Sequence, residues 1–512
     1  YMVVAANPIA AKAGADILKA GGSAVDAAIT TQLVLNMVEP QSSGIGGGAF
    51  MLHWDAKAKA LTSFDGRETA PAAAKPDRFL TSDRKPMDRM TAVVGGRSVG
   101  VPGVLRMLEM AHKRYGKLSW GKLFVPAIRI ADEGFPVSPR LHELLAADRA
   151  LRTIEPAKSF FYDANGEPKP VGTRIVNPAF AKVLREIAAK GPDAFYTGAI
   201  ADDIVRTVTT SPRSPGDITA ADLANYRAIE RPAICGTYRM YKVCGMGPPT
   251  AGGIGVLQVL LEANRLALAD RAVYIDDPDV IPVPTQALIA PDYLAQRSAL
   301  IERDKRLPQT PAGKVPVKGA YNLVPAASPE LPSTSHFSIV DRAGNAVAIT
   351  TSVENSFGSR LMVDGFLLNN TLTDFSWEEG VKSETVANSV GPNKRPRSSM
   401  APTIVFDPKG KLEYVLGSPG GPAIVAFVAK TLVSMIDWRM TPGQATASSY
   451  AIGFGRMVTL EPGLAKLEGE LKALGHDVRV GDYPSGVHAI RVTPNGLQGG
   501  ADPRREGTPA GG

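Results

Sequence analysis

The chain has 512 residues, of which 44% are hydrophobic and 21% charged, a composition typical of a globular protein and not of a disordered one. Its net charge of +7 is modest and no dense lysine or arginine block occurs, so a nucleic-acid partner is not indicated. No apolar run reaches the ~18 residues that a membrane span needs, and the best candidate, residues 423–436, contains Lys430. The first residue is not methionine, so we expect that a signal segment has been removed.

The N-terminal part predicts helices followed by strands. Residues 8–38 have the pattern of two helices, and Ser23 with Asp26 forms a capping-box-like start for the second. Residues 44–49 are a near match to a dinucleotide-binding fingerprint, but they follow a helix and precede an apolar strand at 50–54. We therefore predict a close-packed turn there and no nucleotide site.

Two residues in the next stretch invite a functional interpretation. Arg67 lies in a loop after a predicted strand end, where an arginine is most often a solvated surface charge. Residues 96–100 match the G-x-S-x-G nucleophile elbow and follow residues 91–94, which we predict to be a strand. The match is weak, because residues 101–103 delay the helix that an elbow requires at once. Ser98 is therefore only a minor candidate nucleophile.

Residues 104–250 alternate amphipathic helices with loops and contain no metal-ligand spacing, so no metal site is expected there. Cys235 and Cys244 flank a predicted hairpin across which they could face each other. In an oxidising compartment they would be a plausible disulfide, and in the cytosol two free thiols. A helix is predicted at 254–269, and residues 308–332 contain six prolines and suggest an extended linker.

The strongest signal lies at residues 334–352. Apolar residues alternate on both sides of a turn at 341–345, as in a half-buried hairpin. The turn places Thr334 opposite Ser352 or Val353, and opposed residues have Cβ atoms about 5 Å apart on one face. A threonine hydroxyl would thus lie beside a serine hydroxyl.

Cleavage of the Ser333–Thr334 bond would give Thr334 a free α-amino group next to its own hydroxyl. An α-amino group titrates near pH ~7.7–8, so the pair is a nucleophile with a built-in base. We predict this cleavage, which would divide the chain into residues 1–333 and 334–512. Further on, residues 412–416 predict a strand and residues 417–421 a turn before a helix that begins near Pro422, where backbone N–H groups can face an anion.

Three motifs together resemble the γ-glutamyltranspeptidase family: Thr-Ser-His-Phe-Ser at 334–338, Arg-Pro-Arg-Ser-Ser-Met at 395–400 and Gly-Ser-Pro-Gly-Gly at 417–421. These proteins are amino-terminal-nucleophile hydrolases that cut themselves into a large and a small subunit. The resemblance covers nearly the whole chain. It implies an α/β fold of four layers, an αββα sandwich, no cofactor, and a bacterial protein that is periplasmic or secreted.

The resemblance also implies roles for individual residues. Thr334 would be the nucleophile, Ser352 would hydrogen-bond to it or to its amine, and Gly420 and Gly421 would form the oxyanion hole. The substrate α-carboxylate would be held by Arg67, Ser398 and Ser399, and the α-amino group by Glu354, Thr371 and Asp374. Thr371 departs from the family, where glutamine or glutamate is usual, and the segment at 377–392 is shorter, which implies a reduced lid.

The implied activity is hydrolysis or transfer of γ-glutamyl groups from glutathione and other γ-glutamyl amides, through an ester on Thr334. Water or an amino-acid or peptide acceptor would release the acyl group. Three alternatives stay open: an acylase for glutaryl-type or cephalosporin-type amides, a catalytically silent member that binds amino acids or peptides, and a serine hydrolase using Ser98.

Overall fold

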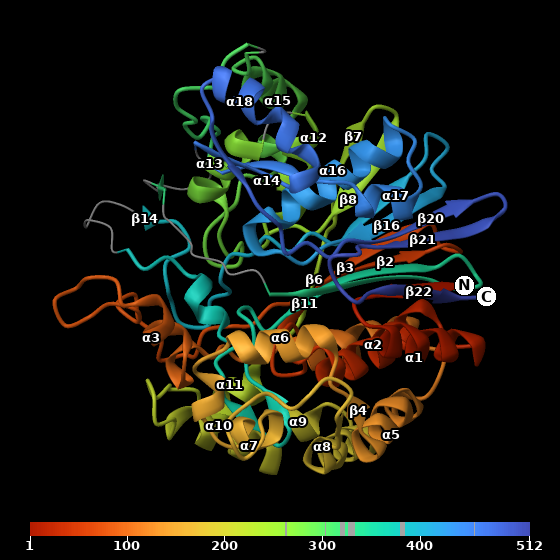
Figure 1. The fold of residues 1–512 in the computed structure, drawn as a ribbon, viewed down its shortest axis with the longest axis vertical. Helices are drawn as coiled ribbons and strands as arrows, with labels where there is room; N and C mark the ends of the chain where they lie inside the picture. Colours follow the sequence, from red (N-terminus) through yellow and green to blue (C-terminus); the bar gives the residue numbers. More distant parts are fainter. Residues whose placement is uncertain (262–263, 303, 318–322, 326–332, 379–384, 455) are drawn as a thin grey trace.

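The computed structural model describes the whole chain except residues 262–263, 303, 318–322, 326–332, 379–384 and 455. Two sheets lie face to face in the middle of the molecule, and helices cover the outer face of each (Figure 1). The order of layers is helix, sheet, sheet, helix. The predicted αββα sandwich is confirmed.

The first sheet has seven strands in the order β22-β1-β10-β11-β2-β3-β6. Its strands are β1 (Met2–Ala5), β2 (Gly48–Asp55), β3 (Ala60–Gly66), β6 (Ile229–Arg231), β10 (Ser335–Val340), β11 (Ala346–Ser352) and β22 (Thr508–Gly511). Helices α1 (Pro8–Lys19) and α2 (Ala24–Val38) pack on its outer face. The predicted capping box is present, since Asp26 N donates to Ser23 Oγ and Ser23 N to the Asp26 carboxylate. Helix α4 (Val104–Tyr115) lies beside α2 and packs on β3. Further helices on this side of the sheet include α5 (Val125–Glu133), α6 (Pro139–Ala147), α8 (Pro178–Lys190) and α10 (Ala199–Thr209).

The second sheet has six strands in the order β21-β20-β16-β15-β8-β7. Its strands are β7 (Ile234–Tyr238), β8 (Tyr241–Gly245), β15 (Thr403–Phe406), β16 (Leu412–Gly417), β20 (His488–Thr493) and β21 (Gly496–Ala501). Helices α12 (Gly252–Leu261), α16 (Ile424–Ile436) and α17 (Pro442–Ala447) cover it. Cys235 and Cys244 face each other across the β7–β8 hairpin and are disulfide-bonded.

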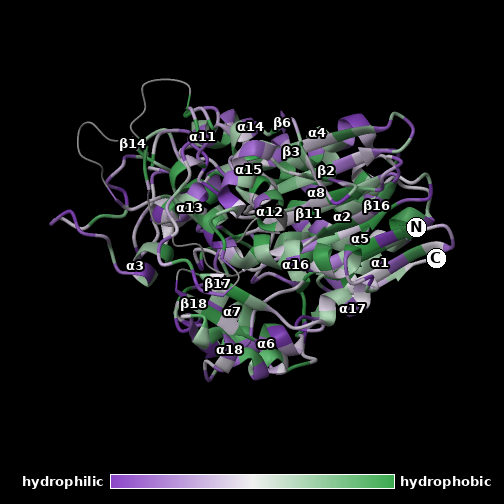
Figure 2. Cartoon of the chain, turned by 90° about the horizontal axis from the view of Figure 1, so that it is seen from above, coloured by the Kyte–Doolittle hydropathy of each residue, from purple (hydrophilic) through white to green (hydrophobic). Residues whose placement is uncertain are grey.

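Side chains from both sheets form the inner core, including those of Val4, Leu52, Ile404, Val415 and Ile490, all fully buried. Because successive residues of a strand point to opposite faces, the same strands also supply the cores under the helices. Apolar residues accordingly colour both the central strands and helices such as α2 and α16 (Figure 2). Among the described residues, no helix has both the length and the apolar character needed to cross a membrane.

The predicted hairpin at 334–352 forms the two central strands of the first sheet. Phe337 pairs with Ile349 and Val340 with Ala346, and Asp341 N donates to Asn345 O at 2.9 Å to close the turn. Continued by one residue past Ser335–Thr351, this register places Thr334 opposite Ser352, which confirms the predicted juxtaposition.

Several sequence-based boundaries were wrong. Residues 91–94 are not a strand but belong mainly to α3 (Arg89–Val93), because Asp88 caps a helix there by accepting from Thr91 N at 3.0 Å. The helix predicted at 254–269 is two helices, α12 and α13 (Asn264–Tyr274). The predicted linker at 308–332 and the shortened lid at 377–392 lie partly outside the described residues.

Candidate active site

Two hydroxyl groups and one carbonyl meet at the junction before β10. Thr334 is buried, its Oγ1 donates to the carbonyl of Ser333 at 2.5 Å, and it lies 3.2 Å from Ser352 Oγ. Ser352 Oγ also donates to the Ser333 carbonyl, at 2.8 Å. The hydroxyl expected to attack therefore lies against the carbonyl that it would attack, and that carbonyl is polarised by a second donor.

Hydrogen bonds from Glu354 and Arg505 hold these groups in place. Glu354 N donates to Ser352 Oγ at 2.8 Å, which leaves the serine proton to point at the Ser333 carbonyl. The buried guanidinium of Arg505 donates to Thr334 O at 2.7 Å. Thr334 is thus fixed from the hairpin on one side and from the C-terminal segment on the other.

A small cavity opens onto this junction. It is lined by Arg67, Thr334, Ser352, Glu354, Asp374, Ser398, Ser399, Met400, Gly421 and Ile424. Most of the predicted site residues are therefore brought together from segments that are far apart in the sequence. Gly420 lies beside this cavity in the chain, and Thr371 is not among the lining residues.

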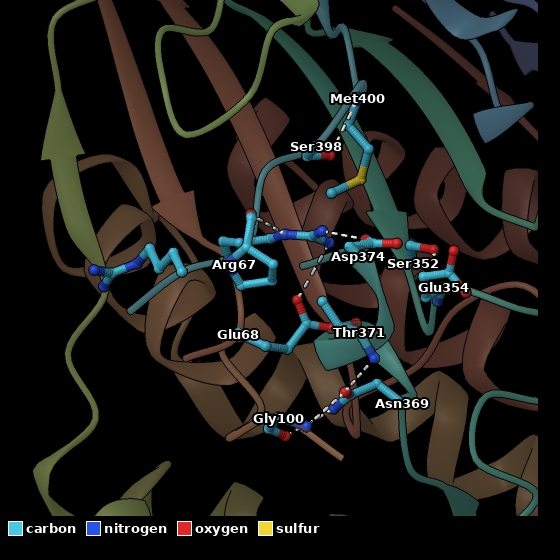
Figure 3. Close-up of polar contacts among 12 residues, drawn as sticks. Arg67, Glu68, Gly100, Ser352, Glu354, Asn369, Thr371, Asp374, Ser398 and Met400 are labelled. Atoms are coloured by element: carbon cyan, nitrogen blue, oxygen red, sulfur yellow. Dashed lines mark hydrogen bonds and ion pairs between the residues drawn. The ribbon is translucent and has the colours of Figure 1, made fainter. Parts of the chain in front are cut away.

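Arg67 is the charged centre of the cavity (Figure 3). It follows β3, is 1% exposed, and donates through Nη2 to Asp374 Oδ2 at 2.5 Å and to Arg397 O at 3.0 Å. Burial by itself would lower the pKa of Arg67, but the carboxylates of Asp374 and Glu68 outweigh it and raise that pKa. The guanidinium is therefore permanently charged and paired with Asp374.

Two carboxyl groups face the same cavity. Asp374 ends the short 3-10 helix Thr371–Asp374, and its carboxyl shares a hydrogen bond with that of Glu354. Burial raises the pKa of Asp374 against the opposing effect of Arg67. Asn370 Nδ2 donates to Glu354 Oε2 at 2.8 Å and fixes the second carboxyl. Carboxyl oxygens in this arrangement are acceptors suited to an ammonium group.

The serine pair supplies hydroxyl groups on another wall. Ser398 Oγ accepts from Met400 N at 3.1 Å, which orients it. Ser399 Oγ is buried and has no hydrogen-bond partner within the part of the chain that the structure describes. A buried hydroxyl without a partner is costly, so a ligand carboxylate that accepted from it would be stabilised.

The glycine turn after β16 provides the remaining wall. Gly420 has φ 131°, and a Cβ there would lie 2.5 Å from Phe427 Cε2, so only glycine fits without strain. Gly421 has φ 57°, begins a 3-10 turn that leads into α16, and lines the cavity with Thr334. The backbone of this turn therefore borders the cavity that Thr334 also lines.

The Thr371 hydroxyl is bonded to a neighbouring carboxyl group, and Thr371 is not among the residues that line the cavity. Its hydroxyl donates to Glu68 Oε1 at 2.7 Å, and Glu68 Oε2 lies 3.6 Å from Arg67 Nη1 (Figure 3). Glu68 is fully buried, and burial raises its pKa to about 7. The sequence analysis missed Glu68, and its position directly after Arg67 was the one available signal.

Ser98 does not have the environment of an elbow nucleophile. It is fully buried, and its hydroxyl donates to Val93 O at 2.6 Å and Gly95 O at 3.0 Å. A helix also precedes it where an elbow requires a strand. The geometry therefore contradicts the serine-hydrolase alternative.

Comparison with known proteins decides the family. The family model described as Gamma-glutamyltranspeptidase matches residues 10–261 and 255–512. The chain belongs to the γ-glutamyltranspeptidase family. The glutathione hydrolase proenzyme of Bacillus subtilis (strain 168) is 39% identical over 469 residues, covering 86% of this chain and 78% of the relative. That of Escherichia coli (strain K12) is 36% identical over 543 residues, covering 98% and 90%.

Proteins with acylase names are also similar to this chain. The acylase ACY 1 proenzyme of Pseudomonas sp. (strain SE83) is 32% identical and covers 99% of this chain and 93% of its own. The crystal structure of cephalosporin acylase from Bacillus halodurans superposes with a TM-score of 0.83 at 26% identity, covering 100% and 95%. Sequence similarity thus spans both hydrolase-named and acylase-named relatives.

Proposed function

We propose that this protein hydrolyses and transfers γ-glutamyl groups of glutathione and other γ-glutamyl amides. The observation that carries the proposal is the cavity that combines the Thr334 hydroxyl with one buried guanidinium and two carboxyl groups. A γ-glutamyl group carries an α-carboxylate and an α-ammonium, which complement these charges. The hydrolase-named relatives support the same activity.

The enzyme would first be activated by self-cleavage. Thr334 Oγ1 attacks the carbonyl carbon of Ser333, the C–N bond of that peptide breaks, and the hydroxyl proton ends on the threonine nitrogen. Water then hydrolyses the ester, leaving a Ser333 carboxylate and a free Thr334 amine and hydroxyl. The products would be a large subunit of residues 1–333 and a small subunit of residues 334–512.

Turnover would use the groups that cleavage exposes. The Thr334 amine accepts the hydroxyl proton as the oxygen attacks the γ-glutamyl carbonyl, and it passes that proton to the leaving amine as the amide C–N bond breaks. The turn at Gly420 and Gly421 would stabilise the oxyanion, an effect often worth ~3–4 kcal/mol per donor. Water or the amine of an amino acid or peptide then releases the acyl group from Thr334.

Recognition of the amino-acid head would divide between two sets of side chains. Arg67, Ser398 and Ser399 would donate to the α-carboxylate, and Asp374 with Glu354 would accept from the α-ammonium. The existing bond between Arg67 and Asp374 holds both groups apart from water until the substrate supplies each with a new partner. Thr371 would act indirectly, through its hydrogen bond to Glu68.

The protein would function outside the cytoplasm, in the periplasm or after secretion. The bonded cysteines of the β7–β8 hairpin support this proposal, because structural disulfides persist in oxidising compartments.

A second candidate function is the hydrolysis of glutaryl-type or cephalosporin-type amides. The acylase-named relative and the similarity to the cephalosporin acylase structure favour it. A glutaryl group has the carboxylate but no ammonium, so it would leave Asp374 and Glu354 unused.

The two functions are separated by comparing kcat/KM for γ-glutamyl and glutaryl anilides in wild type and Asp374→Asn. We expect wild type to prefer the γ-glutamyl anilide. Loss of one charge-assisted hydrogen bond, about 1.5–3 kcal/mol, should reduce that preference roughly ten- to a hundredfold. A wild-type preference for the glutaryl anilide, unchanged in Asp374→Asn, would favour the acylase.

A further inference from the structure

The side chain of Ser333 is held as firmly as its carbonyl. Ser333 is 2% exposed, and its hydroxyl donates to the backbone carbonyl of Gln41 at 2.7 Å. Its own carbonyl accepts from Thr334 Oγ1 and Ser352 Oγ. Three hydrogen bonds therefore hold Ser333 in place, one made by its side chain and two accepted by its backbone carbonyl.

The acceptor belongs to a hydrogen-bonded turn. Gln41 lies in the turn that follows α2, where Ser42 N and Ser43 N both donate to Glu39 O. The carbonyls of this turn also accept from the loop after β11: Gln41 O from Phe357 N at 3.0 Å, and Ser42 O from Val353 N at 3.1 Å. The turn after α2 thus contacts both Ser333, which precedes Thr334, and the loop that follows Ser352.

We propose that the hydrogen bond from Ser333 Oγ to Gln41 O is a positioning contact used in self-cleavage and not in turnover. It fixes the Ser333 side chain, so the carbonyl cannot rotate away from Thr334 Oγ1 and Ser352 Oγ. The proposal rests on the self-cleavage described under the proposed function. Ser333 is a positioning residue here, because its hydroxyl does not touch the reacting oxygen.

The contact would be used once in the life of each molecule. When the ester is hydrolysed, Ser333 becomes a chain end with its own carboxylate and is no longer bonded to Thr334. The contacts of Val353 and Phe357 with the turn do not depend on the broken bond and persist in the cleaved enzyme. Loss of the Ser333 hydroxyl should therefore slow maturation while leaving the mature enzyme unchanged.

The chain offers a matched control on the other side of the nucleophile. Ser335 is fully buried on β10, and its hydroxyl has no hydrogen-bond partner among the described residues. Ser335→Ala therefore makes the same chemical change at the same depth without removing a hydrogen bond. Ser333→Thr keeps the hydroxyl and serves as the conservative rescue.

The experiment is a pulse-chase measurement of full-chain cleavage for wild type, Ser333→Ala, Ser333→Thr and Ser335→Ala. Loss of one buried hydrogen bond should slow cleavage of Ser333→Ala roughly three- to tenfold, with wild-type-like rates for the other two variants. After complete cleavage, kcat and KM for a γ-glutamyl anilide should equal those of wild type, and thermal unfolding should show that each variant is folded.

The outcomes distinguish this inference from the proposed function. Wild-type protein that is folded but never cleaves would overturn self-cleavage and the inference with it. Ser333→Ala that cleaves at the wild-type rate would overturn the inference alone. Equal slowing in Ser333→Thr, or a changed kcat in fully cleaved Ser333→Ala, would also overturn it, because the effect would then not come from a hydroxyl used only in maturation.

Discussion

The junction formed by Ser333, Thr334 and Ser352 and the charged pocket formed by Arg67, Glu354 and Asp374 are built in different ways. At the junction, neutral hydroxyl groups and one carbonyl meet through a single hairpin, with Thr334 and Ser352 only 18 residues apart. In the pocket, Arg67 and Asp374 are 307 residues apart and meet as buried charges. The geometry at Thr334 thus depends on local strand register, whereas that of the pocket depends on long-range packing of ions.

This contrast implies that the two regions fail independently. A change in the pocket should impair substrate use but spare self-cleavage, because no charged side chain of the pocket touches the Ser333 carbonyl among the contacts of the described residues. A change at the junction should impair cleavage first. The predictions below test this separation.

The largest expected effect is the pH dependence caused by Glu68. Its pKa of about 7 in the folded protein exceeds the ordinary value of 4.5, so the folded state binds more protons than the unfolded state between these pH values. Wild type should therefore lose stability relative to Glu68→Gln as pH rises from 4.5 to 8, by about 3 kcal/mol at 1.4 kcal/mol per pKa unit. Urea unfolding of both proteins across this range measures the difference, and parallel curves would show that Glu68 titrates normally.

Arg67→Lys tests whether substrate recognition can be impaired without impairing self-cleavage. Lysine keeps the charge but loses the planar fork that contacts Asp374 and the Arg397 carbonyl together. We expect kcat/KM for a γ-glutamyl anilide to fall roughly ten- to a hundredfold, with self-cleavage at the wild-type rate. Slow cleavage in the folded variant would mean that the two regions are coupled.

Thr371→Val should have a smaller effect, transmitted through Glu68. Removal of the hydroxyl deletes one hydrogen bond to that carboxyl and should cost ~1 kcal/mol of stability at pH 8, where Glu68 is mostly ionised. Thr371→Ser keeps the donor and is the control. A large change in the preference for γ-glutamyl over glutaryl anilides in Thr371→Val would instead place Thr371 in direct contact with substrate.

Ser98→Ala should have the smallest effect. The hydroxyl bonds only to backbone carbonyls in the described structure, so its loss should cost about 1 kcal/mol of stability or less. Cleavage and kcat should be those of wild type. Loss of activity in a folded Ser98→Ala variant would instead support the hypothesis of a serine hydrolase that uses Ser98.

The sequence predicts the junction better than the pocket, for a physical reason. Alternation and turn chemistry determine the register of a hairpin, so Thr334 and Ser352 could be placed opposite each other. No local pattern reveals that Thr371 bonds to Glu68 or that Ser333 bonds to Gln41, because these contacts join segments hundreds of residues apart. Local pattern is also ambiguous at residues 91–94, because a short apolar run fits either a strand or a helix. In the structure this segment is helical, and Asp88 caps the helix.

The central claim is that self-cleavage creates the nucleophile at Thr334. Its most direct test is intact-mass and peptide analysis of wild type and Thr334→Ala, each acid-quenched during turnover of a γ-glutamyl anilide. We predict two wild-type fragments, the smaller beginning Thr-Ser-His-Phe and carrying a γ-glutamyl group on its first residue, and a single unmodified chain for Thr334→Ala. Folded wild type that stays in one piece, or a γ-glutamyl group attached to another residue, would contradict the claim.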